Sequence, residues 1–126
     1  MSRAPLGLDH VQVAAPPGCE AAARAFYGEL LGLGELEKPA TLAGRGGVWF
    51  ALTDGAALHV GVVASGFAAA TKAHPALRAA DEGTLRALAD VLARAGAPVR
   101  WDEPLPGVAA RFFTDDPWGN RLELLC

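Results

Sequence analysis

The amino-acid sequence predicts an α+β fold of two tandem βαβββ modules, which form curved mixed sheets with the helices outside. Short strand-like runs surround one amphipathic helix in each half of the chain. Each half closes with a hairpin whose turn contains Asp and Gly. The sequence also repeats at an offset of 64 positions, which indicates a duplicated structural unit. The aligned pairs are His10 with His74, His59 with Glu123, Gly32 with Gly96 and Gly55 with Gly119.

In the first half, the pattern predicts a strand, a helix and three further strands. Alternation places His10 on the polar face of the opening strand, with apolar side chains on the other face. Apolar residues at four-residue spacing predict the helix, namely Ala22, Phe26 and Leu30, and Gly32 is expected to end it. The expected ranges are 8–14, 19–31, 35–38, 48–52 and 57–62.

The second half repeats this order after a linker at 64–72. Its opening strand contains Pro75, which has no N–H to donate, so we expect this strand at an edge of its sheet. Leu85, Leu88 and Leu92 predict the helix. The expected ranges are 73–79, 82–95, 99–101, 109–114 and 121–125, with a turn at 115–120.

The composition of the 126 residues fits one domain, with modules at about 6–63 and 72–126. Hydrophobic residues make up 52%, charged residues 20%, and the formal net charge is −3. This balance argues against disorder and gives no positive field that would attract nucleic acid. No apolar run approaches the roughly 18 residues that cross a membrane, so we expect no membrane-spanning segment.

Cysteine content and the N-terminal residues bear on location. Cys19 and Cys126 are the only cysteines and do not form a CxxC motif, so we expect no disulfide framework. The first residues lack the long apolar core of a signal peptide. We therefore expect a cytoplasmic protein with reduced thiols.

Two stretches carry a resemblance to a known family. One is the opening Asp9-His10-Val11, and the other is the closing sequence FTDDPWGNRLEL at 113–124. Together with the two modules, they resemble the vicinal oxygen chelate superfamily over essentially the whole chain. This superfamily includes glyoxalase I, bleomycin-resistance proteins, extradiol dioxygenases, fosfomycin-resistance enzymes and methylmalonyl-CoA epimerase.

The resemblance implies one divalent metal per site, bound by the first and fourth strands of each module. Carried over residue by residue, the ligands are His10, His59, His74 and Glu123. Imidazole and carboxylate groups suit Zn, Ni, Mn, Fe or Co, and the choice among them stays open. Three or four protein ligands leave one or two positions for a substrate. Glu123 and His59 are the candidate catalytic groups for proton transfer.

Each of these side chains also has a structural interpretation. A single histidine on an apolar strand is more often a hydrogen-bonded core residue than a ligand. The shared 64-residue spacing of all three histidines with Glu123 favours ligation. Arg78 and Arg111 are candidates for contact with an anionic substrate, or for solvated surface positions.

The ligand set leaves the reaction open. Glyoxalase I carries a glutamate, and the epimerase a glutamine, where this chain has His59. The first hypothesis is a metal-dependent enzyme that performs lyase, isomerase or dioxygenase chemistry on a small molecule through a chelated oxyanion. The alternative is a metal-free, ligand-sequestering protein of the bleomycin-resistance type, and a third is an inactive binding domain. The resemblance also implies a homodimer, with sites within one chain or across the dimer.

Overall fold

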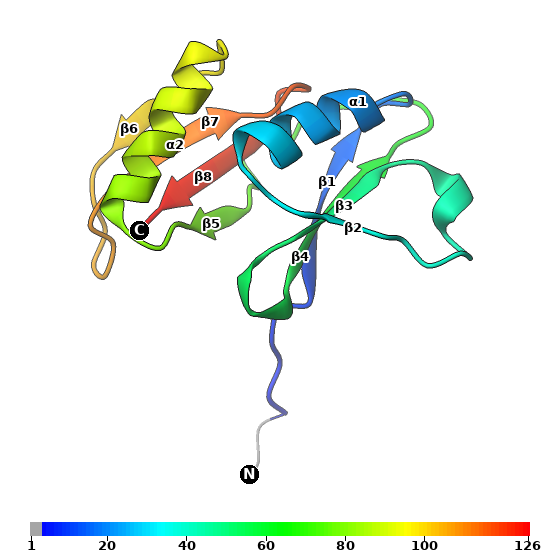
Figure 1. Ribbon diagram of the computed structural model, residues 1–126, viewed down its shortest axis with the longest axis horizontal. Helices are drawn as coiled ribbons and strands as arrows, with labels where there is room; N and C mark the ends of the chain where they lie inside the picture. Colours follow the sequence, from blue (N-terminus) through cyan, green and yellow to red (C-terminus); the bar gives the residue numbers. More distant parts are fainter. Residues whose placement is uncertain (1–3) are drawn as a thin grey trace.

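The computed structural model describes residues 4–126 and contains two four-stranded sheets that lie side by side (Figure 1). The strand order is β1-β4-β3-β2 in the first sheet and β5-β8-β7-β6 in the second. In each sheet the opening strand runs parallel to the closing strand, and the other pairs are antiparallel. A helix covers one face of each sheet (Figure 1). The predicted α+β architecture of tandem mixed sheets with outer helices is confirmed.

The first module contains β1–β4 and a two-part helix. The strands are His10–Ala15, Glu35–Leu36, Val48–Ala51 and Ala57–Val62. The helix starts as α1, Glu20–Ala23, and continues as the π-helical segment η1, Arg24–Leu30, where the sequence predicted one regular helix. The wider turns place two adjacent aromatic side chains, Phe26 and Tyr27, on the buried face. Short 3-10 turns at Ala43–Arg45 and Thr53–Gly55 complete this module.

The second module contains β5–β8 and the helix α2. The strands are Ala76–Arg78, Arg100–Asp102, Arg111–Asp115 and Arg121–Leu125, and α2 is Glu82–Arg94. The strand predicted at 73–79 is shorter than expected, because Pro75 cannot donate a ladder hydrogen bond. Its predicted place at an edge of the sheet is confirmed.

The two modules share one strand register. Where both sheets are paired, adding 64 to the residue numbers of a pair in the first sheet gives a pair in the second sheet. Gln12 pairs with His59 as Ala76 pairs with Glu123. Trp49 pairs with His59 as Phe113 pairs with Glu123. Leu36 pairs with Trp49 as Arg100 pairs with Phe113. The internal repeat seen in the sequence is therefore a repeat of backbone structure.

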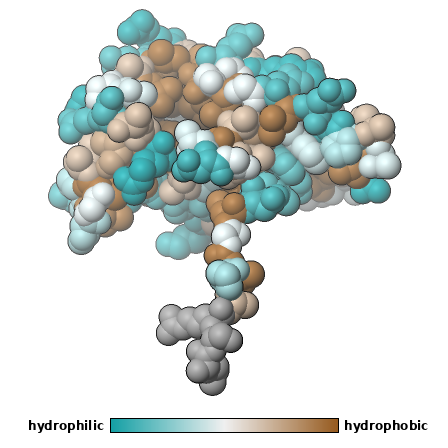
Figure 2. Space-filling view, turned by 60° about the horizontal axis from the view of Figure 1, so that its bottom comes forward, coloured by the Kyte–Doolittle hydropathy of each residue, from teal (hydrophilic) through white to brown (hydrophobic). Residues whose placement is uncertain are grey.

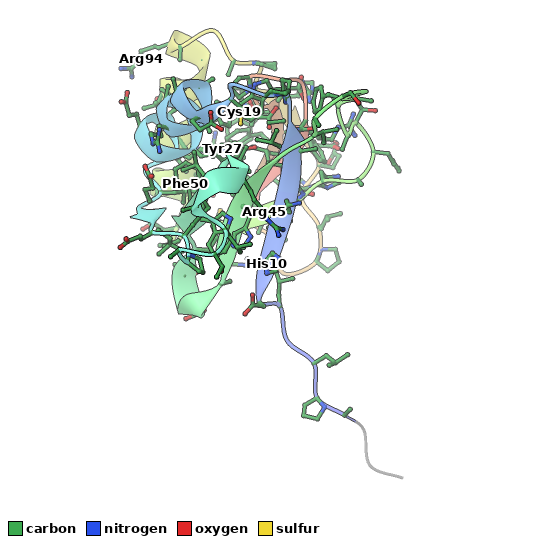
Figure 3. The ribbon with its side chains drawn as sticks, turned by 90° about the vertical axis from the view of Figure 1, so that its right-hand side faces the viewer. His10, Cys19, Tyr27, Arg45, Phe50 and Arg94 are labelled. Atoms are coloured by element: carbon green, nitrogen blue, oxygen red, sulfur yellow. The ribbon has the colours of Figure 1, made fainter. Side chains whose placement is uncertain are left out.

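The core lies between each sheet and its helix. Alternate residues of the central strands point into it and are nearly inaccessible, such as Phe50 and Leu58 in the first module and Phe112 and Leu122 in the second. Figure 3 shows Tyr27 and Phe50 in this interior. The residues between them along each strand lie on the opposite face, away from the helix. That second face carries the predicted ligands.

A buried polar cluster joins the two modules. The carboxylate of Asp116 accepts hydrogen bonds from the Tyr27 hydroxyl at 2.8 Å and from the Asn120 amide N–H at 2.8 Å. The Asn120 side chain donates from Nδ2 to the Ala14 carbonyl oxygen at 2.7 Å and accepts from the Ala70 N–H at 3.0 Å. Burial, and then the charge of Asp116, raises the pKa of Tyr27 well above its ordinary value. The turn predicted at 115–120 therefore holds the two modules together.

Residues 4–9 extend away from the sheets (Figures 1 and 2). Leu6 and Leu8 in this segment are both exposed. Across the described residues 4–126, no helix is long and apolar enough to cross a bilayer. Cys19 and Cys126 are both free thiols, as expected.

Candidate functional site

The first half-site consists of His10, His59 and Trp49, on the face of the first sheet that points away from the helix. The pairing of β3 with β4 sets Trp49 opposite His59, and the rings stack at 3.9 Å between centroids with 2° between their planes. The parallel pairing of β1 with β4 brings His10 against the other face of His59, at 4.2 Å and 14°. His10 lies at the start of β1 (Figure 3). The imidazole of His59 is therefore held between two flat rings.

The environment of this stack favours a neutral His59. Only 9% of the residue is exposed. Burial lowers the pKa of His59 below its ordinary value, the neighbouring His10 ring adds to this effect, and the charge of Asp9 opposes it. Desolvation disfavours the charged imidazolium, so the neutral ring dominates at pH 7. A neutral imidazole is the form that binds a metal or accepts a proton.

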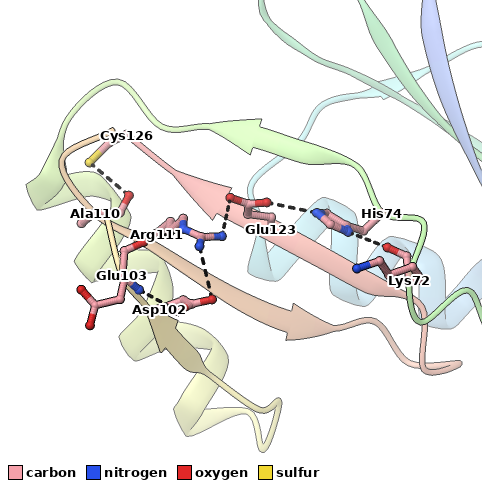
Figure 4. Close-up of polar contacts among 8 residues, drawn as sticks. All are labelled: Lys72, His74, Asp102, Glu103, Ala110, Arg111, Glu123 and Cys126. Atoms are coloured by element: carbon pink, nitrogen blue, oxygen red, sulfur yellow. Dashed lines mark hydrogen bonds and ion pairs between the residues drawn. The ribbon is translucent and has the colours of Figure 1, made fainter. Parts of the chain in front are cut away.

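The second half-site consists of His74, Glu123 and Arg111 (Figure 4). The His74 Nε2 atom lies 3.0 Å from Oε1 of Glu123, and its Nδ1 atom lies 2.8 Å from the carbonyl oxygen of Lys72. The Glu123 side chain is only 9% exposed, and that of His74 is 26% exposed. The backbone just before β5 therefore fixes the orientation of the His74 ring.

The hydrogen bonds of His74 indicate which of its ring nitrogens carries a proton and which faces Glu123 as an acceptor. A carbonyl oxygen only accepts hydrogen bonds, so Nδ1 of His74 carries the proton that the Lys72 carbonyl accepts. In a neutral ring Nε2 is then an acceptor, and it faces a carboxylate oxygen that is also an acceptor. Two acceptors at 3.0 Å need a cation between them, either a proton or a metal ion. The distance of 3.0 Å is that of a hydrogen bond between the two side chains, and both atoms are also of the types that bind a divalent metal.

Arg111 supports Glu123 through its guanidinium group. Its Nη1 atom lies 3.4 Å from Oε2 of Glu123, and its Nη2 atom lies 3.3 Å from the Asp102 carboxylate. Its Nε atom donates to the Glu103 carbonyl oxygen at 2.7 Å, and only 13% of the side chain is exposed. The solvated position expected as one alternative for this arginine is therefore wrong, and contact with an anionic substrate stays a prediction.

The four predicted ligands form two pairs within one chain. His10 and His59 belong to the first module, and His74 and Glu123 to the second. In the part of the chain that the structure describes, 4–126, no three His, Cys, Asp or Glu side chains converge on one point. The fold therefore presents two half-sites.

Sequence reasoning missed the groups that orient the candidate side chains. The stacking of Trp49 on His59 was readable, because a hairpin at 48–62 sets these residues opposite each other. The contact of His10 Nδ1 with the Asp9 carboxylate at 2.7 Å had a weaker signal, since neighbours in a strand usually point apart. No pattern in the sequence indicated the Lys72 carbonyl contact, which depends on the path of the linker.

With this geometry described, comparison with known proteins decides the family. The family model described as Glyoxalase/Bleomycin resistance protein/Dioxygenase superfamily matches residues 7–124. The chain belongs to this superfamily. No curated protein sequence matches the chain.

Solved structures agree with this membership. A protein of Bacillus anthracis named for the glyoxalase family is 42% identical, with a TM-score of 0.87 over 99% of this chain and 98% of that chain. A lactoylglutathione lyase from Agrobacterium tumefaciens is 20% identical, with a TM-score of 0.68 over 98% and 95%. The fosfomycin resistance protein FosX from Listeria monocytogenes, complexed with Mn(II), is 15% identical, with a TM-score of 0.74 over 95% and 91%. The last two show likeness of fold alone.

Proposed function

We propose that this protein is a divalent-metal-dependent enzyme of the glyoxalase-like type that acts on a small oxygenated molecule. The observation that carries the proposal is the pair of acceptors in the second half-site. Nε2 of His74 and Oε1 of Glu123 face each other at 3.0 Å, while Nδ1 of His74 is already bound to a carbonyl oxygen. Metal-ligating histidines usually donate their other N–H in this way.

The chemistry of the donor set fits such a metal. Three imidazoles and one carboxylate form a nitrogen- and oxygen-rich set that suits Zn, Ni, Mn, Fe or Co. His10 contacts a carboxylate through Nδ1, which leaves Nε2 available as a ligand. The low pKa of His59 supplies a neutral ring beside it. His10, His59, His74 and Glu123 would hold the metal.

We propose that a second copy of the chain completes each site. The ligands of one chain form two separate pairs, so neither pair alone satisfies a metal that prefers at least three protein ligands. A symmetric dimer sets the first half-site of one copy against the second half-site of the other, and does so twice. This arrangement forms two equivalent sites from two chains.

Within that site the side chains have distinct parts in the chemistry. A bound divalent metal supplies charge that stabilises an oxyanion on the substrate. Glu123 is the one carboxylate of the set, and Arg111 holds its second oxygen, so the carboxylate is oriented to accept a proton. His59 is the second candidate for proton transfer because its ring stays neutral at pH 7. The Trp49 ring excludes water from one side of that imidazole.

Metal content tests the proposal directly. Protein purified without chelator is expected to hold about one divalent ion per chain by elemental analysis. His10→Ala and His74→Ala should each weaken metal binding by about 100-fold, because each removes a ligand. Glu103→Gln is the matched control: its side chain is exposed and outside the half-sites, and it should leave the metal content unchanged. Full occupancy in the double histidine variant would refute the metal site.

Turnover separates catalysis from ligand storage. Glu123→Asp keeps the charge but withdraws the carboxylate by about 1 Å, and a displacement of that size can cost ~100-fold in rate. We expect this variant to retain its fold and lose most activity in a screen of α-ketoaldehyde–thiol adducts, catechols and acyl-CoA thioesters. No turnover in the whole screen, together with tight binding of bulky aromatic compounds by metal-free protein, would instead establish the sequestering function of the bleomycin-resistance type.

A further inference from the structure

The repeat creates two related junctions between the modules, and their polar contacts differ. At the closed junction, the turn between β7 and β8 meets the edge strand β1. Asn120 Nδ2 donates there to the Ala14 carbonyl oxygen at 2.7 Å, and Asp116 binds the Tyr27 hydroxyl. These hydrogen bonds join turn, strand and helix, so this junction is held by polar side chains.

At the open junction, the turn between β3 and β4 faces the edge strand β5 across a cavity of about 500 Å³. Ala56 and Leu52 occupy the repeat positions of Asn120 and Asp116, 64 residues earlier in the chain. Neither of these side chains forms hydrogen bonds, so no equivalent bridge can form. The cavity is lined by Leu31 to Gly34, Ala51 to Thr53, Ala56, Ala76 to Ala79, Thr84, Leu88 and Leu124.

The lining has the chemistry of a small-molecule pocket with one charge. Among residues 4–126, Arg78 is the only charged residue that lines it, and two threonines are the only other polar side chains. The volume lies within the range of about 300–1,000 Å³ usual for ligand sites, which are mostly apolar with a few polar groups. The other residues expose aliphatic carbon or peptide groups to the cavity.

Arg78 is available to an anion. Four arginines have carboxylate partners, namely Arg24, Arg86, Arg100 and Arg111, whereas Arg45, Arg94 and Arg121 have none within residues 4–126. Within residues 4–126, Arg78 has no such ion pair, and it is exposed. It lies on β5, whose outer edge has no strand partner, so peptide N–H groups there remain free to donate.

We propose that the open junction binds a small apolar molecule that carries one anionic group. The apolar part fills the space among Leu31, Leu52 and Leu88, and the anion meets the guanidinium of Arg78. His10, His59, His74 and Glu123 do not line this cavity. The proposal therefore does not depend on the proposed function.

Two fluorescent probes that differ in one charge test this site. Anilinonaphthalene sulfonate carries an anion, and N-phenylnaphthylamine has the same apolar frame without it. We expect one sulfonate probe to bind per chain of the native protein. Arg78→Gln should weaken the sulfonate probe roughly tenfold and leave the neutral probe unchanged, because only the ion pair is lost. An equal effect on both probes, or on neither, would overturn the role of Arg78.

Filling the cavity tests its location. Ala56→Trp should reduce binding of both probes at least about tenfold, and Ala79→Leu serves the same purpose if the first variant does not melt cooperatively. Ala25→Trp, which fills a different cavity beside α1, should bind both probes as the parent does. Glu123→Gln should also bind them normally, which separates this site from the metal site. No binding, binding that the filling variants do not alter, or binding only to dissociated chains would overturn the proposal.

Discussion

The two half-sites occupy the same positions of the repeat, but different kinds of contact fix their side chains. In the first, His59 lies flat between Trp49 and His10, and burial, followed by the neighbouring His10, lowers its pKa. In the second, Glu123 lies between His74 and Arg111, and hydrogen bonds and charge keep it in place. The register of the strands is identical in both modules. Duplication of the backbone has therefore preserved where the side chains lie, while the residues themselves differ: one half-site holds stacked rings and the other a histidine in contact with a carboxylate.

A comparison of Gly47 with the equivalent position of the second module gives the largest expected effect on stability. Gly47 has φ of +82°, and an added Cβ would lie 2.1 Å from the Val60 carbonyl oxygen. Arg111 occupies the equivalent position of the second module. Gly47→Ala should destabilise the fold by about 3 kcal/mol, because the backbone must move and the conformation is strained. Denaturant unfolding measures this loss.

Gly44→Ala in the same loop is the control, since an added Cβ there meets nothing within 4 Å and φ is not positive. Its free energy of unfolding should stay within about 0.5 kcal/mol of the parent. Similar losses in both alanine variants would show that the close approach of Gly47 to β4 is not what constrains this loop.

The two junctions should differ in what their turns contribute. Asp116→Ala removes a buried carboxylate that accepts hydrogen bonds from Tyr27 and Asn120, and should cost about 3 kcal/mol. Leu52→Ala, at the equivalent position, truncates a half-buried side chain beside the cavity and should cost about 1 kcal/mol. Equal losses in chemical denaturation would contradict the distinction between a closed and an open junction.

A smaller effect concerns acid stability of the first module. The Gly47 N–H donates to the Glu20 carboxylate at 2.8 Å, and this bond lowers the pKa of Glu20 below 4.5. The ionised form is favoured in the folded state, so its stabilising contribution is present above pH 4.5 and is lost as pH falls through the lower folded pKa. Glu20→Gln should therefore show a smaller drop in Tm than the parent between about pH 5 and pH 3. An identical drop in Tm in both proteins would show that ionisation of Glu20 does not contribute to acid stability.

Much of the fold was predictable from the sequence because periodicity and repetition are local signals. The β8 strand was predicted at its observed bounds, and the offset of 64 corresponds to a shared register. The π-helical segment was not predicted, because a four-residue spacing of apolar side chains is also compatible with a regular helix. The start of β5 was predicted three residues too early, because edge strands tolerate proline near their start and Pro75 was therefore counted in the strand.

The strand positions of the candidate site residues were predictable from the sequence, and their arrangement in space was less so. The shared spacing of His10, His59, His74 and Glu123 pointed to four residues on equivalent strands, and the structure places each on the face away from its helix. How the two modules are set against each other depends on packing across the linker, through Asn120 and Asp116. Sequence periodicity does not describe such long-range contacts, so the separation into two half-sites became visible only in three dimensions.

Mixing two inactive variants tests the central claim most directly. One variant carries His10→Ala and His59→Ala, and the other carries His74→Ala and Glu123→Ala, so neither homodimer has an intact set of ligands. If each site combines the first half-site of one chain with the second half-site of its partner, a mixed dimer contains one complete site. We expect co-refolded protein to regain up to about one metal ion per mixed dimer, measured by elemental analysis after the species are separated. Mixed dimers that stay as free of metal as either parent variant would contradict the account.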